Sequence, residues 1–241
     1  MKAFLLAGGL GTRLRPLTDS TPKCLLTIQG TPMLRIWFDL CRQHGIDEVL
    51  INVHSHGGAV RKFIEGNRDG LSVRLFEEAE LLGSAGTVLA NRDWVGSEKC
   101  FWVLYADVLT TTNLTEMLAF HDSRGQIATI GVYEVPEPSR CGIVQVDERG
   151  VVRDFAEKPK APAGNLAFSG LMLATPALFD SIPDSRPVDL GFHVLPQIVG
   201  RMAAYRIPDF LIDMGTLETY RAAQVLWPGR SGSQKQGGFR V

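Results

Sequence analysis

The sequence predicts an α/β protein built on a mixed, mostly parallel central sheet. Over residues 1–135, short apolar runs alternate with stretches whose apolar residues recur at helical spacing, a pattern typical of parallel strands joined by helices. The chain has 241 residues, of which 45% are hydrophobic, and a chain of this length buries about 70–75% of its unfolded surface. We therefore expect one globular unit around one sheet.

Local signals support each element of this first half. Residues Lys2–Ala7 are almost entirely apolar, as in a buried strand. Helix Met33–Gln43 follows Pro32, a favourable start because the first helical turn leaves its N–H groups unbonded anyway. The remaining elements expected here are strands Asp47–Val53, Ser72–Phe76, Cys100–Tyr105 and Gln126–Tyr133, helices Gly58–Glu65 and Leu114–Ser123, and a loop followed by a helix over Gly83–Asn91. This order predicts a Rossmann-like three-layer fold, with helices on both faces of the sheet.

The pattern becomes less regular after Pro136. Two short strands, Gly142–Val146 and Val151–Phe155, flank Asp147–Gly150, whose composition is typical of a hairpin turn. The elements expected after them are strands Leu166–Leu173, Met202–Ile207 and Phe210–Ile212, and helices Val188–Gly200 and Thr216–Leu226. We expect a single domain over residues 1–227, with a smaller C-terminal region at 136–227. The last residues, 228–241, are rich in glycine, serine and glutamine, which predicts a flexible tail.

Charge and composition exclude several classes of protein. A net charge of −1 argues against a strongly basic face, so we expect no nucleic-acid partner. No apolar run approaches the roughly 20 residues that span a bilayer, so we expect no membrane segment. The four cysteines are scattered without a C-x-x-C pair, as in reduced proteins. We therefore expect a cytoplasmic protein.

A glycine-rich loop follows the first strand. It matches neither common phosphate-binding motif, because no Gly-Lys pair completes a P-loop and Leu14 stands where the third glycine of G-x-G-x-x-G would be. The glycines still allow the backbone to approach a ligand and direct its N–H groups toward it. Arg13 offers a planar fork suited to phosphate oxygens, and Lys23 adds a compact positive charge. On these residues alone, a strand-to-helix turn with solvated basic side chains is the alternative.

The spacing of these residues resembles a known signature. L-A-G-G-x-G-T-R-L-x-P-L-T runs from Leu6 to Thr18 and continues with Pro22-Lys23, as in the sugar-1-phosphate nucleotidyltransferases. The chain is similar in type to the small mannose- and heptose-1-phosphate guanylyltransferases. The resemblance implies that the loop wraps a nucleoside triphosphate, that Arg13 binds the departing pyrophosphate and that Lys23 bridges phosphates at the reaction centre. The implied nucleotide-binding residues of this loop are Leu6, Ala7, Gly8, Gly9, Gly11 and Thr12.

The base-reading segment of this family has a counterpart at Leu82–Gly86, where L-G-S-A-G replaces the usual L-G-T-A-G. Glu78 lies five residues before Gly83, at a position that faces the base in relatives. The resemblance therefore implies nucleotide contacts from Glu78, Gly83 and Ala85. Guanine offers N–H donors at N1 and N2 that a carboxylate could accept together, which favours guanylyl over uridylyl or thymidylyl transfer, although some uridylyltransferases also carry an acid nearby.

Two aspartates occupy the positions at which the family holds Mg²⁺. Asp107 follows an apolar strand, although Ala106 replaces the glycine that most relatives carry there. Asp213 begins D-M-G-T, which corresponds to the family's D-x-G-T. Mg²⁺ prefers carboxylate oxygens together with several waters, so the resemblance implies one or two ions at this pair. Without the resemblance, Asp107 would be interpreted as a helix cap.

The acceptor side resembles the family less completely. The F-x-E-K-P motif is intact at Phe155–Pro159, which implies that Glu157 and Lys158 grip the sugar hydroxyls and the phosphate. Gly170 survives from the usual N-x-G-x-Y, but the amide and the phenol are missing. Gly142 follows a cysteine instead of the usual aromatic residue. We therefore expect these residues to line an altered or less polar sugar pocket, such as one for a heptose, a deoxysugar or a cyclitol.

These motifs together imply a transferase. A sugar 1-phosphate has a second pKa of about 6, so it is ionised near neutral pH and can attack the α-phosphorus of a nucleoside triphosphate without a general base. The expected reaction is Mg²⁺-assisted in-line transfer of a nucleoside monophosphate, with GTP favoured, which releases pyrophosphate and an NDP-sugar. Open alternatives are uridylyl, thymidylyl or cytidylyl transfer to another sugar, cyclitol or alcohol phosphate, and a non-catalytic regulatory protein that binds nucleotide sugars. A homo-oligomer would fit the resemblance.

Overall fold

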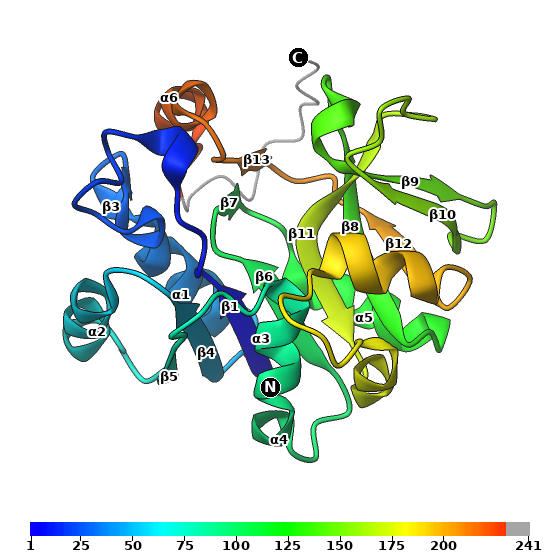
Figure 1. Ribbon diagram of the computed structural model, residues 1–241, viewed down its shortest axis with the longest axis horizontal. Coiled ribbons are helices and arrows are strands. Elements are labelled where there is room, and N and C mark those ends of the chain that lie inside the picture. Colours follow the sequence, from blue (N-terminus) through cyan, green and yellow to red (C-terminus); the bar gives the residue numbers. More distant parts are fainter. Residues whose placement is uncertain (230–241) are drawn as a thin grey trace.

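The structure, a computed structural model, describes residues 1–229, so residues 230–241 of the expected tail lie outside the described residues. Within residues 1–229 a nine-stranded sheet has the order β10-β9-β11-β6-β1-β4-β5, and β8 and β12 join it through β11 (Figure 1). The strands are β1 (Lys2–Leu6), β2 (Thr27–Ile28), β3 (Thr31–Pro32), β4 (Glu48–Val53), β5 (Ser72–Glu77), β6 (Phe101–Tyr105), β7 (Val108–Thr110), β8 (Ala128–Glu134), β9 (Gly142–Val146), β10 (Val152–Glu157), β11 (Leu166–Ala174), β12 (Met202–Arg206) and β13 (Leu211–Asp213). The α-helices are α1 (Met33–Gln43), α2 (Gly57–Gly66), α3 (Ser84–Ala90), α4 (Arg92–Val95), α5 (Leu114–Arg124) and α6 (Leu217–Leu226). No helix in this part of the chain is long and apolar enough to cross a membrane.

The sheet combines a parallel core with antiparallel additions. β5, β4, β1 and β6 run parallel to one another, and β12 runs parallel to β8. β11 pairs antiparallel with both β6 and β8, and β9 and β10 form an antiparallel hairpin beside it. The expected mixed, mostly parallel sheet of an α/β fold is confirmed.

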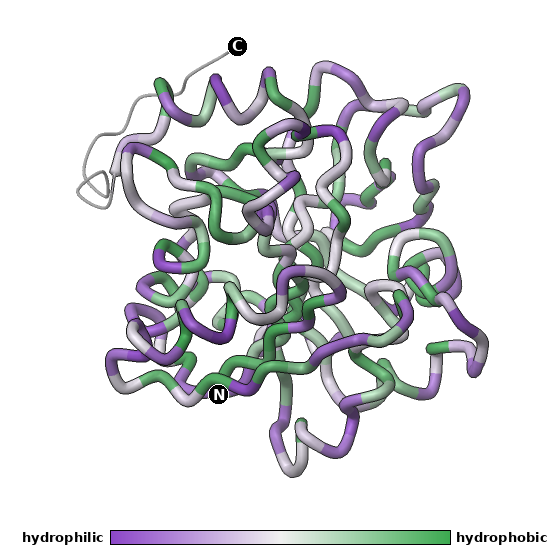
Figure 2. The backbone as a smooth tube through the Cα atoms, turned by 60° about the vertical axis from the view of Figure 1, so that its left-hand side comes forward, coloured by the Kyte–Doolittle hydropathy of each residue, from purple (hydrophilic) through white to green (hydrophobic). Residues whose placement is uncertain are grey.

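Alternation along the central strands divides the core into two layers. In β1, Ala3 and Leu5 face a hydrophobic cluster with α1, α2 and α5, whereas Phe4 faces a second cluster with α3 and the turns of residues 176–198. All three side chains are fully buried. Figure 2 shows the hydrophobic segments along the central strands and the hydrophilic residues mostly in the peripheral loops. Side chains that alternate across a strand thus produce the three layers.

One expected helix is wrong. Residues 188–200 form two short turns instead of a continuous α-helix: η5 (Leu190–Val194), a π-helical turn, and η6 (Leu195–Ile198), a 3-10 turn. Pro196 lies at the start of η6 and has no N–H to donate to the preceding turn, which interrupts the helical hydrogen bonds. Asp189 caps η5 by accepting a hydrogen bond from Gly191 N at 2.9 Å.

Among the strands and α-helices, three short features were not predicted: the hairpin of β2 and β3, the strand β7 and the helix α4. Each segment has only two to four residues, which is too short to show a period. β7 matters most for the site, because it pairs with β13 in a separate two-stranded ladder. The strand expected at Phe210–Ile212 is shifted by one residue and ends at Asp213.

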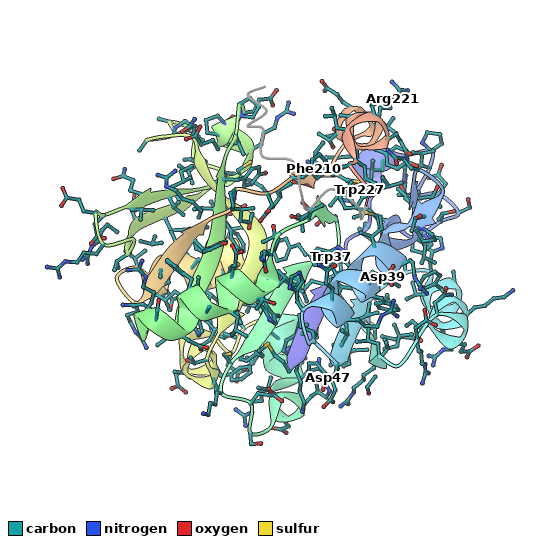
Figure 3. All side chains as sticks on the ribbon, turned by 180° about the vertical axis from the view of Figure 1, so that it is seen from behind. Trp37, Asp39, Asp47, Phe210, Arg221 and Trp227 are labelled. Carbon is teal, nitrogen blue, oxygen red and sulfur yellow. The ribbon has the colours of Figure 1, made fainter. Side chains whose placement is uncertain are left out.

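The last helix, α6, returns to the N-terminal half of the chain. Tyr220 Oη and Gln224 Nε2 both donate to the carbonyl of Thr27, at 2.9 and 2.6 Å. Phe210 and Trp227 meet edge to face near this helix, with ring centroids 5.5 Å apart (Figure 3). These contacts hold the segment that carries β13 against the beginning of the chain.

A glycine substitution tests how tightly two distant segments pack. Gly83 has a φ of +78°, and a β-carbon there would lie 2.7 Å from the carbonyl carbon of Val188. Gly83→Ala must displace the backbone, so we expect the free energy of unfolding to fall by about 2–4 kcal/mol. Gly164→Ala is the matched control, because no atom lies within 4 Å of its β-position. Urea denaturation measures both variants, and equal stabilities would contradict this account.

Candidate active site

The β7–β13 ladder brings two carboxylates together at the carboxyl ends of the central strands. Asp107 immediately precedes β7, and Asp213 ends β13 opposite Val108. Met214 N donates to the carbonyl of Asp107 at 3.0 Å, which joins the two segments a second time. The two predicted metal ligands are therefore neighbours despite their distance in the sequence.

Two basic side chains face this pair. Lys23 Nζ lies 2.6 Å from Asp107 Oδ2, and the lysine side chain is only 12% exposed. Arg13 lies beside Asp213, since a β-carbon built on Gly215 would be 3.1 Å from Arg13 Nη2 and 3.2 Å from Asp213 Oδ1. The structure thus brings together all four residues that were predicted to form the reaction centre.

The electrostatics of Asp213 reflect this crowding. Desolvation by the surrounding chain and then repulsion by Asp107 raise the pKa of Asp213 to about 6, although its side chain keeps contact with solvent. The charges of Lys23 and Arg13 oppose this rise in pKa. Two carboxylates that repel each other in this way favour a cation between them.

The glycine loop is anchored on one side and open on the other. Leu14 is fully buried, and Thr18 Oγ1 donates to the carbonyl of Gly11 at 2.8 Å. Of the loop residues predicted to bind nucleotide, the half-buried ones are Leu6, Ala7, Gly8 and Gly11, and the exposed ones are Gly9, Thr12 and Arg13. The loop therefore presents backbone and a guanidinium to solvent beside the carboxylate pair, as binding of a triphosphate requires.

The predicted base-reading loop is docked on a distant segment. The N–H groups of Ala85 and Gly86 both donate to the carbonyl of Val188 at 3.0 Å, and Val188 N donates to the carbonyl of Leu82 at 2.8 Å. Ala85 is fully buried, so it shapes the loop from behind. A cavity of about 390 Å³ opens beside this loop, bounded by residues 76–82, Arg186 and Pro187. Its volume is within the range of small-molecule pockets, which begins at about 300 Å³.

Glu78 borders this cavity, but the residue is only 6% exposed. Its Oε1 accepts a hydrogen bond from Asn52 Nδ2 at 2.8 Å and a short one from Thr87 Oγ1. Its Oε2 accepts a longer hydrogen bond from Leu82 N, at 3.3 Å. Asn52 Oδ1 also accepts from Ala7 N at 2.8 Å, so this network joins the base side to the glycine loop.

Glu157 ends β10 on the acceptor side of the site. Its carboxylate packs directly on two glycines. A β-carbon built on Gly142 would lie 2.6 Å from Glu157 Oε2, and one built on Gly191 would lie 2.8 Å from Glu157 Cδ. Burial raises the pKa of Glu157, and the charge of Lys158 only partly opposes it. Lys158 Nζ lies 3.6 Å from Glu157 Oε1 and 5.5 Å from the ring centre of Phe192. The predicted acceptor residues Gly142, Glu157 and Lys158 are therefore in one place.

Tyr105 connects the acceptor side to the carboxylate pair. A β-carbon built on Gly170 would lie 3.0 Å from the β-carbon of Tyr105, so the tyrosine packs directly on this glycine. Gly170 is itself buried. Burial, together with the charges of Asp189 and Glu157, raises the pKa of Tyr105 well above its usual value. The charge of Asp107 acts on the same phenol. Carboxylates from both sides of the site thus surround one tyrosine.

The sequence patterns missed four polar residues around this site: Asn52, Ser84, Thr87 and Asp189. Asn52 lies one residue before the carboxyl end of the parallel strand β4, the edge at which ligands bind in open α/β sheets, and this position could have drawn attention to it. Ser84 Oγ donates to Asp189 Oδ2 at 2.9 Å and accepts from Leu190 N at 2.7 Å. Ser84 lies within the L-G-S-A-G segment, but no sequence signal indicates its role, because its partners Asp189 and Leu190 are distant in the chain. Thr87 directly follows the same segment, and its bond to Glu78 spans a loop that the sequence pattern does not define.

Comparison with known proteins identifies the family. The nucleotidyl transferase family model matches residues 2–227. The chain belongs to the nucleotidyl transferase family. The membership predicted from the glycine loop and the later motifs is therefore confirmed.

Curated relatives of this nucleotidyl transferase include mannose-1-phosphate guanylyltransferases. Mannose-1-phosphate guanylyltransferase 1 of Arabidopsis thaliana is 37% identical over 227 residues, which cover 91% of this chain and 63% of the relative. The mannose-1-phosphate guanylyltransferase catalytic subunit beta of Drosophila melanogaster is 31% identical, over 94% of this chain and 62% of the relative. The chain thus spans less than two thirds of the length of these relatives.

A solved structure shares the fold of this nucleotidyl transferase. It is a Bacillus anthracis protein described as a glucose-1-phosphate thymidylyltransferase, in complex with sucrose. The two chains superpose with a TM-score of 0.84 at 24% identity, over 99% of this chain and 98% of the other. At this identity the similarity shows the fold alone, and it confirms the Rossmann-like arrangement.

The carboxylate pair of this nucleotidyl transferase suits Mg²⁺. Within residues 1–229, no group of three histidine, cysteine or acidic side chains gathers to hold a metal ion. Mg²⁺ is commonly held by one or two carboxylates together with substrate phosphates and water. Asp107 and Asp213 supply that donor set beside a loop shaped for phosphates. Magnesium binding by this pair stays a prediction.

Lys23 offers a test of the charge balance at this pair. Its ammonium offsets the repulsion between Asp107 and Asp213, so we expect Lys23→Met to lower the free energy of unfolding by about 1–3 kcal/mol. Added Mg²⁺ should stabilise the variant more than the wild type, because the ammonium no longer competes for the carboxylates. Urea unfolding at several Mg²⁺ concentrations measures both effects, with the exposed Lys160→Met as control. A variant that gains no more from Mg²⁺ than the wild type would count against this charge balance.

Proposed function

We propose that this chain transfers GMP from GTP to a sugar 1-phosphate, which yields pyrophosphate and a GDP-sugar. The observation that carries the proposal is the meeting of Arg13, Lys23 and the two aspartates at the carboxyl ends of β1 and β6. Ligands bind at this edge in open α/β sheets. The names of the relatives support GTP and mannose 1-phosphate as the first pair of substrates to test.

The proposed reaction needs control of charge more than acid–base catalysis. An oxygen of the acceptor phosphate forms a bond to the α-phosphorus of GTP while the bond from this phosphorus to the pyrophosphate oxygen breaks. The acceptor phosphate is already ionised, so no residue has to remove a proton. Arg13 is placed to bind the leaving pyrophosphate and Lys23 to bind the α-phosphate, where negative charge accumulates. Mg²⁺ bound at the aspartates would supply further Lewis-acid stabilisation of the phosphate oxygens.

The acceptor would bind between the Glu157–Lys158 pair and the reaction centre. The Glu157 carboxylate can accept hydrogen bonds from sugar hydroxyls, and the Lys158 ammonium can bind the phosphate. In this proposal residues 1–135 form the nucleotide-binding half and residues 136–227 the sugar-binding half. A cytoplasmic location and a homo-oligomer, both expected from the sequence, stay predictions.

The main competing function is a regulatory protein that binds nucleotide sugars without catalysis. Such a protein needs no reaction centre. Here Arg13, Lys23, Asp107 and Asp213 are all retained and lie close together. This convergence favours catalysis.

The proposed reaction is tested by pyrophosphate release from a set of nucleoside triphosphates against a panel of sugar 1-phosphates, with Mg²⁺ present. We expect GTP with mannose 1-phosphate to give acceptor-dependent release that EDTA abolishes. Release with another base or with a cyclitol or alcohol phosphate would reassign the substrates. No pyrophosphate release with any pair of substrates, with nucleotide-sugar binding still seen by calorimetry, would favour the regulatory function.

The metal assignment is tested separately by Asp107→Asn. The amide keeps the shape of the side chain but is a weaker Mg²⁺ ligand than the carboxylate. We expect kcat to fall by at least about 100-fold, because the bound ion would stabilise the phosphate charge. Asp93→Asn is the control, since that side chain is 98% exposed. Steady-state kinetics measure both variants, and unchanged turnover in Asp107→Asn would refute the assignment.

A further inference from the structure

The base side of the site contains a buried hydrogen-bond network whose role the proposed reaction leaves open. Glu78, Asn52 and Thr87 are 6%, 5% and 0% exposed and come from the loop after β5, from β4 and from α3. Buried polar groups are costly unless they are bonded, and each of these three is bonded to the others. The network therefore fixes the orientation of the Glu78 carboxylate.

The two oxygens of Glu78 have different surroundings. Oε1 accepts from both Asn52 Nδ2 and Thr87 Oγ1. Oε2 receives the longer hydrogen bond from Leu82 N at 3.3 Å and lies 3.7 Å from the position of a β-carbon on Gly8. Oε2 is thus the oxygen that lies between the glycine loop and the base-reading loop.

Glu78 is one of the residues that line the cavity beside the base-reading loop. Its volume is about 390 Å³, and its walls include Phe76, Leu82 and Pro187. Pockets for small molecules are lined mainly by apolar side chains with a few placed polar groups. The other walls carry the charged Glu77, Glu80 and Arg186, but Glu78 is the carboxylate whose orientation the buried network fixes. A flat heteroaromatic ring that carries N–H donors on its edge could lie against Phe76, Leu82 and Pro187 and donate to Glu78.

We propose that Asn52 and Thr87 are positioning residues for base selection, because they occupy Oε1 of Glu78 and leave Oε2 as the acceptor offered to the nucleobase. This inference rests on the proposed guanylyl transfer and deepens it. Guanine carries adjacent N–H donors that can converge on one oxygen. Uracil and thymine carry a single N–H donor between two carbonyl oxygens, which a carboxylate repels. A site built to accept hydrogen bonds discriminates against a base that supplies fewer of them.

Asn52 extends this effect to the phosphates. Its Oδ1 accepts from Ala7 N at 2.8 Å, and a β-carbon on Gly8 would lie 2.6 Å from its Nδ2. One amide therefore sets both the course of the glycine loop and the direction of Glu78. Loss of Asn52 should weaken binding of every nucleoside triphosphate, whereas loss of the Thr87 hydroxyl should act on base choice.

The test compares Thr87→Val, which removes the hydroxyl and keeps the shape, with Thr87→Ser, which keeps the hydroxyl. We expect Thr87→Val to lower the GTP-to-UTP ratio of kcat/KM by about tenfold and Thr87→Ser to keep that ratio within about twofold of the wild type. Thr129→Val is the matched control, because Thr129 is also fully buried and its hydroxyl bonds His121 at 2.9 Å in another part of the sheet. An unchanged ratio in folded Thr87→Val would overturn the inference.

Asn52→Ala provides a second, independent variant. We expect the KM for both GTP and UTP to rise several-fold, because the anchor of Ala7 N is lost, and the GTP-to-UTP ratio to fall as well. Asn67→Ala is the control, since its amide bonds only the carbonyl of Phe63 within its own helix end, at 2.8 Å. A loss of thermal stability in Asn52→Ala without any change in KM or ratio would overturn the positioning role.

Failure of this inference and failure of the proposed function give different results. If the wild-type protein releases no pyrophosphate with any acceptor, the proposed function fails. Calorimetric affinities of GTP and UTP for the wild type and Thr87→Val then decide the inference alone. A preference for GTP that Thr87→Val reduces supports it, and an equal preference in both proteins overturns it.

Discussion

Two carboxylates held side by side, those of Asp107 and Asp213, are the constraint on which the rest of this site depends. Like charges do not approach each other unless the backbone forces them together, and here the β7–β13 ladder does so. The basic residues Arg13 and Lys23 come from the opposite end of the chain and offset part of the repulsion. The packing of α6 against the N-terminal half keeps these distant segments in register. The apolar layers on both faces of the sheet thus support a local arrangement that is electrostatically unfavourable on its own.

The parallel half of the fold could be predicted well because its strands are buried on both faces and appear as continuous apolar runs. Helix Met33–Gln43 matches the expected bounds, since Pro32 and the residues after Gln43 mark its ends. The helix predicted for residues 188–200 is wrong, for a reason that the spacing of apolar residues does not reveal. Their apolar spacing is helical, but Pro196 interrupts the hydrogen bonds and tertiary contacts determine the path. The strand β7 was not predicted, because three residues are too few to show an alternating pattern.

The site residues, too, divide into those that local sequence reveals and those that depend on tertiary contacts. Contiguous motifs located Arg13, Asp107 and Glu157, because each lies within a recognisable run of residues. The partners that orient such residues lie outside these motifs, as Asn52 does for Glu78. They are single polar residues in otherwise ordinary elements, and only three-dimensional proximity distinguishes them. Family resemblance therefore points to candidate ligand-binding groups more readily than to the groups that hold them in place.

The peptide group of Val188 links the two sides of the site. It is hydrogen-bonded to the base-reading loop through Leu82 and Ala85, and a few residues later Gly191 packs directly on Glu157. A displacement of the base-reading loop would therefore move Val188, and with it the backbone that packs on the Glu157 carboxylate. The positions of the two sides are therefore set by one shared segment of the chain.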